Sequence, residues 1–436
     1  MRIVEYALKY ASSLGIPETH VVFAESRGFR VEVEADAISK VSFSKSSSLN
    51  ITIIVDKKIA SVATNDLSES NVKRAIDRAF SMARASRPNP FWSGLPEPKP
   101  YPEVEGLYDD RIANMDAELM VELMKTGLQS VKETSTKVTV MQGCLSTGEG
   151  RTIIANSNGI FGESKGTSVN AYLVTVAKEG SEIGSFALED AVSRRLDIDV
   201  EELGESAAKK ALESLHLKPI RGFKGPVILD YDVAGGIFSV LSSAYNGYFI
   251  WRNSSPLKGK IGEQIAVEGL TVIDDGTLPS GIASSPFDRE GSPTMRKVII
   301  EKGILKTYIN NTFTARILQM SPTGNASSLL NVAPTNTIVK PGDWSIDEMI
   351  ESVKQGLFVR RFSGSIRVQD GLVSGAVKQA FYIENGEKKY PVRECMISGN
   401  LYQMIRNISA ISRETKVKRG LITPVLKVEE LAVVGK

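Results

Sequence analysis

The chain has 436 residues, with 53 Lys and Arg against 51 Asp and Glu. Its formal net charge of +2 gives no overall field that would steer it to nucleic acid or to an anionic membrane. An apolar content of 42% and a charged content of 24% are ordinary for a globular protein large enough to hold two or three cores. No apolar run approaches the roughly 20 residues of a membrane span, and the N-terminus lacks the features of a signal peptide. We therefore expect a cytoplasmic protein with no membrane or nucleic-acid partner.

Cysteine and histidine are rare in this sequence. Cys144 and Cys395 are far apart and provide no disulfide framework. The only histidines are His20 and His216, so a zinc site built on two histidines is nearly excluded, and a catalytic triad would need one of them. We expect His20 to lie beside a strand and His216 to end a helix, both in structural roles.

The first part of the chain reads as a helix, then strands, then a second helix. Apolar residues alternate with polar ones over 29–34 and 49–55, which is typical of strands with one buried face. A helix with an apolar stripe follows a capping serine at 68 or 70. The proline-rich stretch at about 87–110 indicates an extended connector.

The middle of the chain mixes helices and strands. The patterns predict helices at about 115–132 and 201–216, and strands near the ranges 137–142, 151–156 and 168–177. The turn sequence Asn-Ser-Asn-Gly separates the second and third of these strands. A glycine- and proline-containing stretch near 221–226 suggests a boundary between residues 1–220 and residues 221–436.

The C-terminal half is rich in strand signals. A short strand at 227–229 leads into a helix from about Asp232, and residues 300–304 and 383–387 each read as a hairpin. Strands outnumber helices without regular alternation. We therefore predict an α+β fold of largely antiparallel sheets with packed helices, made of an N-terminal α/β domain and a strand-rich C-terminal domain.

The densest polar segment lies between residues 271 and 326, and nucleotide-binding, serine-hydrolase and zinc-ribbon motifs are absent. Asp288 and Glu290 could form a carboxylate pair for acid/base work or for a cation. The alternative, which we favour, is that these residues organise turns. Together with Gly324 and Asn325, they are candidates for contact with a substrate or a partner subunit.

Several blocks of sequence, in order along nearly the whole chain, carry a family resemblance. They include LNITIIVDKKIASVATNDLS, ANSNGIFGESKGT, IDDGTLPSG, FDREGSPT, IEKGILKTYINNTFTAR, SPTGNA and ISGNL. This series resembles the signature of the TldD/PmbA family, which is also known by the older label "modulator of DNA gyrase". The resemblance implies proteolysis of unfolded or short peptides by a paired complex.

The same resemblance locates a degenerate metal motif. TldD-like subunits carry a His-Glu-x-x-x-His motif completed by a distant cysteine, whereas PmbA-like (TldE-like) subunits lack it. After the strand VILD, the corresponding positions of this chain hold Tyr231, Asp232 and Gly236, and no cysteine follows Cys395. A catalytic zinc needs about three protein ligands and an activated water. We therefore expect no metal, no cofactor and no catalytic residue at these positions.

Three functional hypotheses follow. The leading one is a non-catalytic subunit that pairs with a metal-bearing TldD-like homologue acting on peptides, while a homodimer stays open as an alternative. The second is a peptidase that works through carboxylates such as Asp288 and Glu290. The third is a modulator that binds another macromolecule, against which the near-neutral charge argues.

Overall fold

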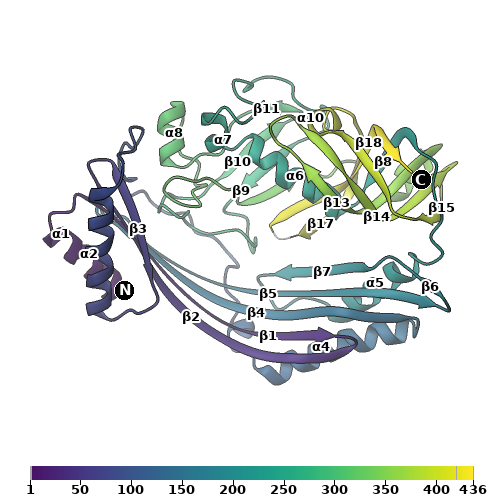
Figure 1. The fold of residues 1–436 in the computed structure, drawn as a ribbon, viewed down its shortest axis with the longest axis horizontal. Coiled ribbons are helices and arrows are strands. Elements are labelled where there is room, and N and C mark those ends of the chain that lie inside the picture. Colours follow the sequence, from purple (N-terminus) through teal and green to yellow (C-terminus); the bar gives the residue numbers. More distant parts are fainter. Residues whose placement is uncertain (1, 419, 436) are drawn as a thin grey trace.

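Two lobes face each other across a central space, a curved sheet below and a strand-rich body above (Figure 1). The structure, a computed structural model, describes residues 2–418 and 420–435. Among these residues, no helix combines the length and the apolar character needed to cross a membrane.

The N-terminal lobe is built on one antiparallel sheet in the order β3-β2-β1-β4-β5-β6, with β7 also paired to β5. Its strands are β1 (Glu18–Glu34), β2 (Ala37–Val55), β3 (Lys58–Thr64), β4 (Val138–Asn156), β5 (Phe161–Glu179), β6 (Glu182–Ile183) and β7 (Ala187–Ser193). Its helices are α1 (Arg2–Ser13), α2 (Glu69–Ala85), α3 (Asp110–Ala113), α4 (Ala117–Thr134) and α5 (Val200–Leu212).

Strand alternation gives this sheet two different faces. The odd-numbered residues Val21, Leu49 and Ile51 are fully buried in a cluster with apolar residues of α1 and α2. The even-numbered residues between them, such as His20 and Thr52, point to the opposite face, because successive side chains of a strand alternate. That second face is the one turned toward the C-terminal lobe (Figure 1).

The C-terminal lobe contains a sheet that partly closes on itself. Its order is β11-β10-β9-β12-β18-β16-β14-β13-β8, and β8 also pairs with β18, which closes β8, β13, β14, β16 and β18 into a barrel. The strands are β8 (Phe223–Leu229), β9 (Val272–Asp275), β10 (Arg296–Glu301), β11 (Ile304–Leu305), β12 (Asn336–Val339), β13 (Gln355–Ile366), β14 (Leu372–Glu384), β15 (Glu387–Val392), β16 (Cys395–Asn400), β17 (Ile408–Lys418) and β18 (Leu421–Val434). The helices are α6 (Tyr231–Ala244), α7 (Gly247–Trp251), α8 (Thr312–Leu318), α9 (Ile346–Glu351) and α10 (Leu401–Met404).

The predicted fold class is confirmed: the chain is α+β, with largely antiparallel sheets. The only parallel strand pairs among the described residues are β12–β18 and β13–β8. Both predicted hairpins form, between β10 and β11 and between β14 and β15. Each turn has two residues with positive φ, Lys302-Gly303 and Asn385-Gly386, as a tight hairpin with the strands' own twist requires.

Two local predictions were wrong. The ranges 137–142 and 151–156 are not separate strands but the two ends of the single 19-residue strand β4. The helix predicted to reach residue 216 ends at Leu212. His216 therefore does not end a helix; it lies beyond α5 with φ of 58° and places Nε2 3.0 Å from an oxygen of Glu179.

The long β1–β4 pair is interrupted once, at Gly28. Pairing is continuous up to Arg27 and resumes at Arg30, and in between Phe29 N–H donates to the Thr147 hydroxyl at 3.3 Å. A Cβ on Gly28 would overlap the Thr147 carbonyl. A glycine at this point lets the two backbones approach closely where the ladder is broken.

We expect Gly28→Ala to lower the free energy of unfolding by about 1–3 kcal/mol, since backbone atoms must move to admit the methyl group. Gly148→Ala is the matched control, because its Cβ would meet only the Ser168 hydroxyl, at 3.3 Å. Urea denaturation of both variants measures the difference. Equal losses would contradict the steric interpretation of Gly28.

Candidate functional site

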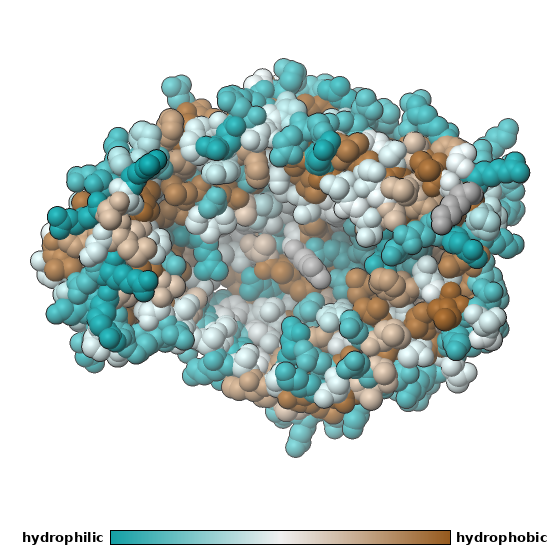
Figure 2. Space-filling model, in the orientation of Figure 1, coloured by the Kyte–Doolittle hydropathy of each residue, from teal (hydrophilic) through white to brown (hydrophobic). Residues whose placement is uncertain are grey.

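A polar cavity of about 400 Å³ lies where the two lobes meet. One wall comes from β4 and β5, with Thr152 and Ser164, and the other from loops of the C-terminal lobe, with Asp288, Arg289 and Asn325. The space-filling view shows the molecule hollowed between the lobes (Figure 2). Three of the four predicted contact residues, Asp288, Gly324 and Asn325, therefore line one cavity, and Glu290 does not.

Asp288 uses both carboxyl oxygens to hold backbone. Oδ1 accepts from the N–H groups of Glu290 and Ser292, at 3.1 and 3.0 Å, and Oδ2 accepts from Ala326 N–H at 2.9 Å. The side chain is buried. Burial and the neighbouring Glu290 carboxylate raise the pKa of Asp288 well above its ordinary value. Asp288 thus ties the 288–292 turn to the loop that carries Ala326.

Glu290 lies deeper than Asp288, almost fully buried. Its Oε1 accepts from the Ser292 hydroxyl at 2.8 Å and from Thr312, through the backbone N–H at 2.9 Å and the hydroxyl at 2.5 Å. Burial raises the pKa of Glu290, against the effect of these donors. Since Thr312 is the first residue of α8, the carboxyl stabilises the start of that helix.

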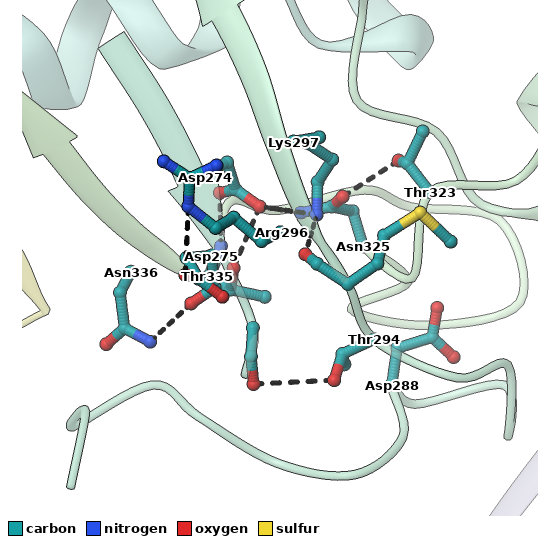
Figure 3. A network of polar contacts seen from close by, with 12 residues as sticks. Asp274, Asp275, Asp288, Thr294, Arg296, Lys297, Thr323, Asn325, Thr335 and Asn336 are labelled. Atoms are coloured by element: carbon teal, nitrogen blue, oxygen red, sulfur yellow. Dashed lines mark hydrogen bonds and ion pairs between the residues drawn. The ribbon is translucent and has the colours of Figure 1, made fainter. Parts of the chain in front are cut away.

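Asn325 is held beside the cavity by a buried ion pair (Figure 3). Asn325 donates to Asp274 Oδ1 at 2.9 Å, and Asp274 lies 2.8 Å from the Lys297 ammonium, with both charged side chains almost fully buried. Gly324 has φ of 70°, and a Cβ there would overlap the Pro293 carbonyl. The loop therefore requires glycine at this position.

The three degenerate metal positions lie at the start of α6, away from this cavity. Tyr231 is half-buried, and burial together with Asp230 raises its pKa to about 12. Asp232 Oδ1 is 3.3 Å from the Lys418 ammonium, and Gly236 is exposed, with open space where a side chain would stand. A neutral phenol, a carboxylate already paired with lysine and a glycine do not fit a zinc ion. In the part of the chain that the structure describes, no group of three or more His, Cys, Asp or Glu could hold a metal.

Lys418 also joins the lobes. Its ammonium pairs with Asp190 of β7, in the N-terminal lobe, as well as with Asp232 of α6. Burial opposes the lysine's charge, but the carboxylates of Asp232 and Asp190 raise the pKa of Lys418 above its ordinary value. The charged lysine is therefore stabilised between the two lobes.

Two residues near the cavity were not predicted to face it. Arg289 is exposed and lines both this cavity and a second one of about 330 Å³ that also contains His20. His20 is buried, and its Nε2 lies 3.1 Å from the Arg289 carbonyl oxygen. The only sequence signal for Arg289 was its place between two candidate acids; nothing in the sequence connected His20 with residue 289.

The fold and this geometry define a two-lobed α+β protein with a cavity between the lobes and with neither histidine nor cysteine at the start of α6. Family models of the PmbA/TldA metallopeptidase match it along its length: domain 1 over residues 21–83, the central domain over 110–215 and the C-terminal domain over 223–435. The chain therefore belongs to the PmbA/TldD family, as the sequence blocks predicted.

Individual relatives agree. The chain is 28% identical over 440 residues to "Metalloprotease PmbA homolog" of Buchnera aphidicola, covering 99% of this chain and 96% of that protein. Among solved structures, TldE from Thermococcus kodakarensis superposes with a TM-score of 0.93 at 26% identity, covering 99% of this chain and 100% of the other. A putative modulator of a DNA gyrase from Thermotoga maritima gives a TM-score of 0.91 at 25% identity, with 99% of each chain covered.

We expect Asp288→Asn to lower the free energy of unfolding by about 1–3 kcal/mol. Both oxygens of Asp288 accept backbone N–H groups, and in the variant an amide NH₂ takes the place of one of these oxygens and cannot accept. Glu290→Gln is the matched control. All its donors bind one oxygen, so the amide can keep that acceptor, and the expected cost is under about 1 kcal/mol. Urea denaturation measures both. If either variant instead kept its stability but lowered peptide turnover by an assembled peptidase complex at least tenfold, that residue would act on substrate. A tenfold loss corresponds to about 1.4 kcal/mol of transition-state stabilisation.

His20 should make stability depend on pH. Burial lowers its pKa from 6.5 to about 4, so the unfolded chain binds a proton that the folded chain does not between these values. Stability should therefore fall as the pH drops from 6.5 to 4, by up to about 3 kcal/mol. His20→Gln keeps an N–H for the Arg289 carbonyl and cannot titrate, so its unfolding free energy should fall less between pH 7 and pH 4.5. Identical pH slopes for the two proteins would rule this out.

Proposed function

We propose that this chain is the metal-free subunit of a two-subunit peptidase, which pairs with a metal-bearing homologue of the same family and acts on unfolded or short peptides. The observation that carries the proposal is the start of α6, where Asp232 is paired with Lys418 at 3.3 Å and Gly236 has no side chain. Those side chains cannot supply the imidazole ligands and free general base of a zinc peptidase. In this proposal the chain supplies the lobes and the cavity between them, and the partner supplies the metal-activated water.

A peptidase that works through Asp288 and Glu290 has less support. Both oxygens of Asp288 already accept backbone N–H groups, and Glu290 lies outside the cavity. A general base must be within hydrogen-bond reach of the reacting proton. The gyrase-modulator description belongs to the Thermotoga maritima relative, and the +2 net charge of this chain offers it no electrostatic support.

The direct test combines the isolated protein with a metal-bearing homologue from the same genome. Alone, the untagged protein should carry well under one transition metal per chain by elemental analysis and should cleave an unstructured peptide no faster than buffer does. With the homologue it should form a stable complex, and cleavage should rise and be abolished by a chelator. Positioning the substrate beside a metal-bound water is what such a complex would add.

The matched control is the same homologue with the glutamate of its metal motif changed to glutamine. It should still form the complex but lose cleavage. Stoichiometric zinc bound at residues 231–236, or chelator-insensitive cleavage that follows the isolated protein through purification, would overturn the proposal.

A further inference from the structure

Part of the edge of β5 beside the cavity has no backbone hydrogen-bond partner, between the points where the connector contacts the strand, with Tyr101 near Gly162 and Leu107 at Thr167. Along one side β5 pairs with β4 from Phe161 to Ala177. On its other side, β7 covers residues 169–175, β6 covers 178–179, and the Leu107 carbonyl accepts the Thr167 N–H at 2.9 Å. Among the described residues, no segment pairs with that side of β5 between Phe161 and Gly166.

The direction of the free backbone groups follows from Thr167. In an antiparallel pair, the N–H and C=O groups of alternate residues point to the same side of the strand. Since Thr167 N–H points away from β4, the backbone groups of Lys165 and Glu163 also point to the open side. Both residues are exposed. An unpaired strand edge of this kind is a template for another extended chain.

The open edge borders the polar cavity. Ser164, Lys165 and Gly166 line it from β5, and Arg289 lines it from the opposite lobe. The Arg289 guanidinium has no hydrogen-bond or ion-pair partner within residues 2–418 and 420–435. Arg194, which also lines the cavity, instead donates to the carbonyls of Gly281, Ile282 and Ser284. Arg289 is therefore the arginine of this cavity that is available to a ligand.

A free arginine beside an open strand edge selects a particular ligand chemistry. The guanidinium binds a carboxylate through two parallel hydrogen bonds, and the strand edge binds a peptide backbone without regard to its side chains. The second cavity continues past Arg289 and Ser327, which line both, along the face of the sheet that carries His20 and Thr52. The two cavities are of the size that ligand-binding sites usually have.

We propose that this cleft holds the C-terminal end of an extended peptide, whose backbone pairs with Glu163 and Lys165 of β5 and whose terminal carboxylate binds Arg289. The choice of a peptide as the ligand rests on the proposed function. The inference adds the place where this subunit holds the peptide and the end of the peptide that it recognises. The cleft is separate from the start of α6, where the family's metal motif would lie.

The test measures the affinity of the isolated protein for a labelled probe by fluorescence anisotropy. The probe is an unstructured eight-residue peptide of Gly, Ser, Ala and Val with an N-terminal fluorophore and a free C-terminal carboxylate. Amidation of that carboxylate, or Arg289→Gln in the protein, should weaken binding at least tenfold. The two changes together should weaken it no further than either alone, since both remove one contact. Arg252→Gln, an exposed arginine outside the cleft, is the control and should bind like the wild type.

Backbone pairing is tested from both sides. Lys165→Pro removes an N–H that points away from β4, so it spares the β4–β5 ladder and should weaken binding at least tenfold. Two further probes carry N-methyl groups on alternate residues, one probe for each of the two possible registers. One of these probes should bind at least tenfold more weakly. This test needs no change in the protein, so it stays valid if Lys165→Pro fails to fold. If acetate at the same concentration as the probe displaced it, the site would bind small carboxylates and not a peptide, and the proposal would be overturned.

The outcome is separable from that of the proposed function. Unchanged affinity in the amidated probe, in Arg289→Gln and with the N-methylated probes would overturn the cleft assignment even if the protein forms an active complex with its homologue. Binding with the expected losses, but no complex with the homologue, would instead leave the cleft assignment standing and overturn the two-subunit function.

Discussion

The cavity walls depend on one constraint: a buried backbone N–H must find an acceptor even where the chain forms no helix or sheet. The loops between β9 and β12 are such a region, and buried acids supply the acceptors. Asp274 accepts from Thr335 N–H, Asp288 accepts three N–H groups and Glu290 accepts from Thr312 N–H. Removing any of these acceptors would leave buried donors unpaired, which costs more than the bond itself contributes.

This role explains why the polar segment resembles a catalytic site in sequence but not in geometry. A catalytic acid or base needs a lone pair or proton turned toward a substrate. Asp288 and Glu290 instead turn their oxygens toward the protein's own N–H and hydroxyl groups, and these donors partly offset the cost of burying the carboxyl groups. The polar groups that face the cavity include hydroxyl groups, the Asn325 amide and the guanidinium of Arg289, beside apolar groups such as Leu107 and Phe287.

The parts of the fold that could be predicted from the sequence are those fixed by local patterns. The hairpins at Lys302-Gly303 and Asn385-Gly386 follow from turn residues that tolerate positive φ. The 19-residue length of β4 could not be predicted, because its middle contains glycine, serine and threonine that read as a loop. Those residues are held in the sheet by pairing on both sides. The partner on one side is β1, which is distant in sequence, and the partner on the other is β5, which follows β4 after a turn. Burial of His20 against the Arg289 carbonyl likewise depends on residues 269 positions apart.

The candidate residues divide in the same way. The density of polar residues between 271 and 326 was enough to group Asp288, Gly324 and Asn325, which line one cavity in the structure. It could not show that Glu290 lies outside the cavity, because that depends on its bonds to Ser292 and Thr312, or that Arg289 lines it. Nor could it show the partner of Asp232, because Lys418 is 186 residues further along the chain.

That lysine neutralises the carboxylate at the start of α6. Without it, the Asp232 carboxylate at the helix start would face Asp190 across the lobe boundary, and two such charges repel each other unless a cation lies between them. The Lys418 ammonium takes that place, in contact with both carboxylates and almost buried. Breaking a buried pair by removing one partner is strongly destabilising, so the lysine and the two acids hold one another in place. The positive charge between these two carboxylates is thus provided by the chain itself, at the point where its two lobes are joined.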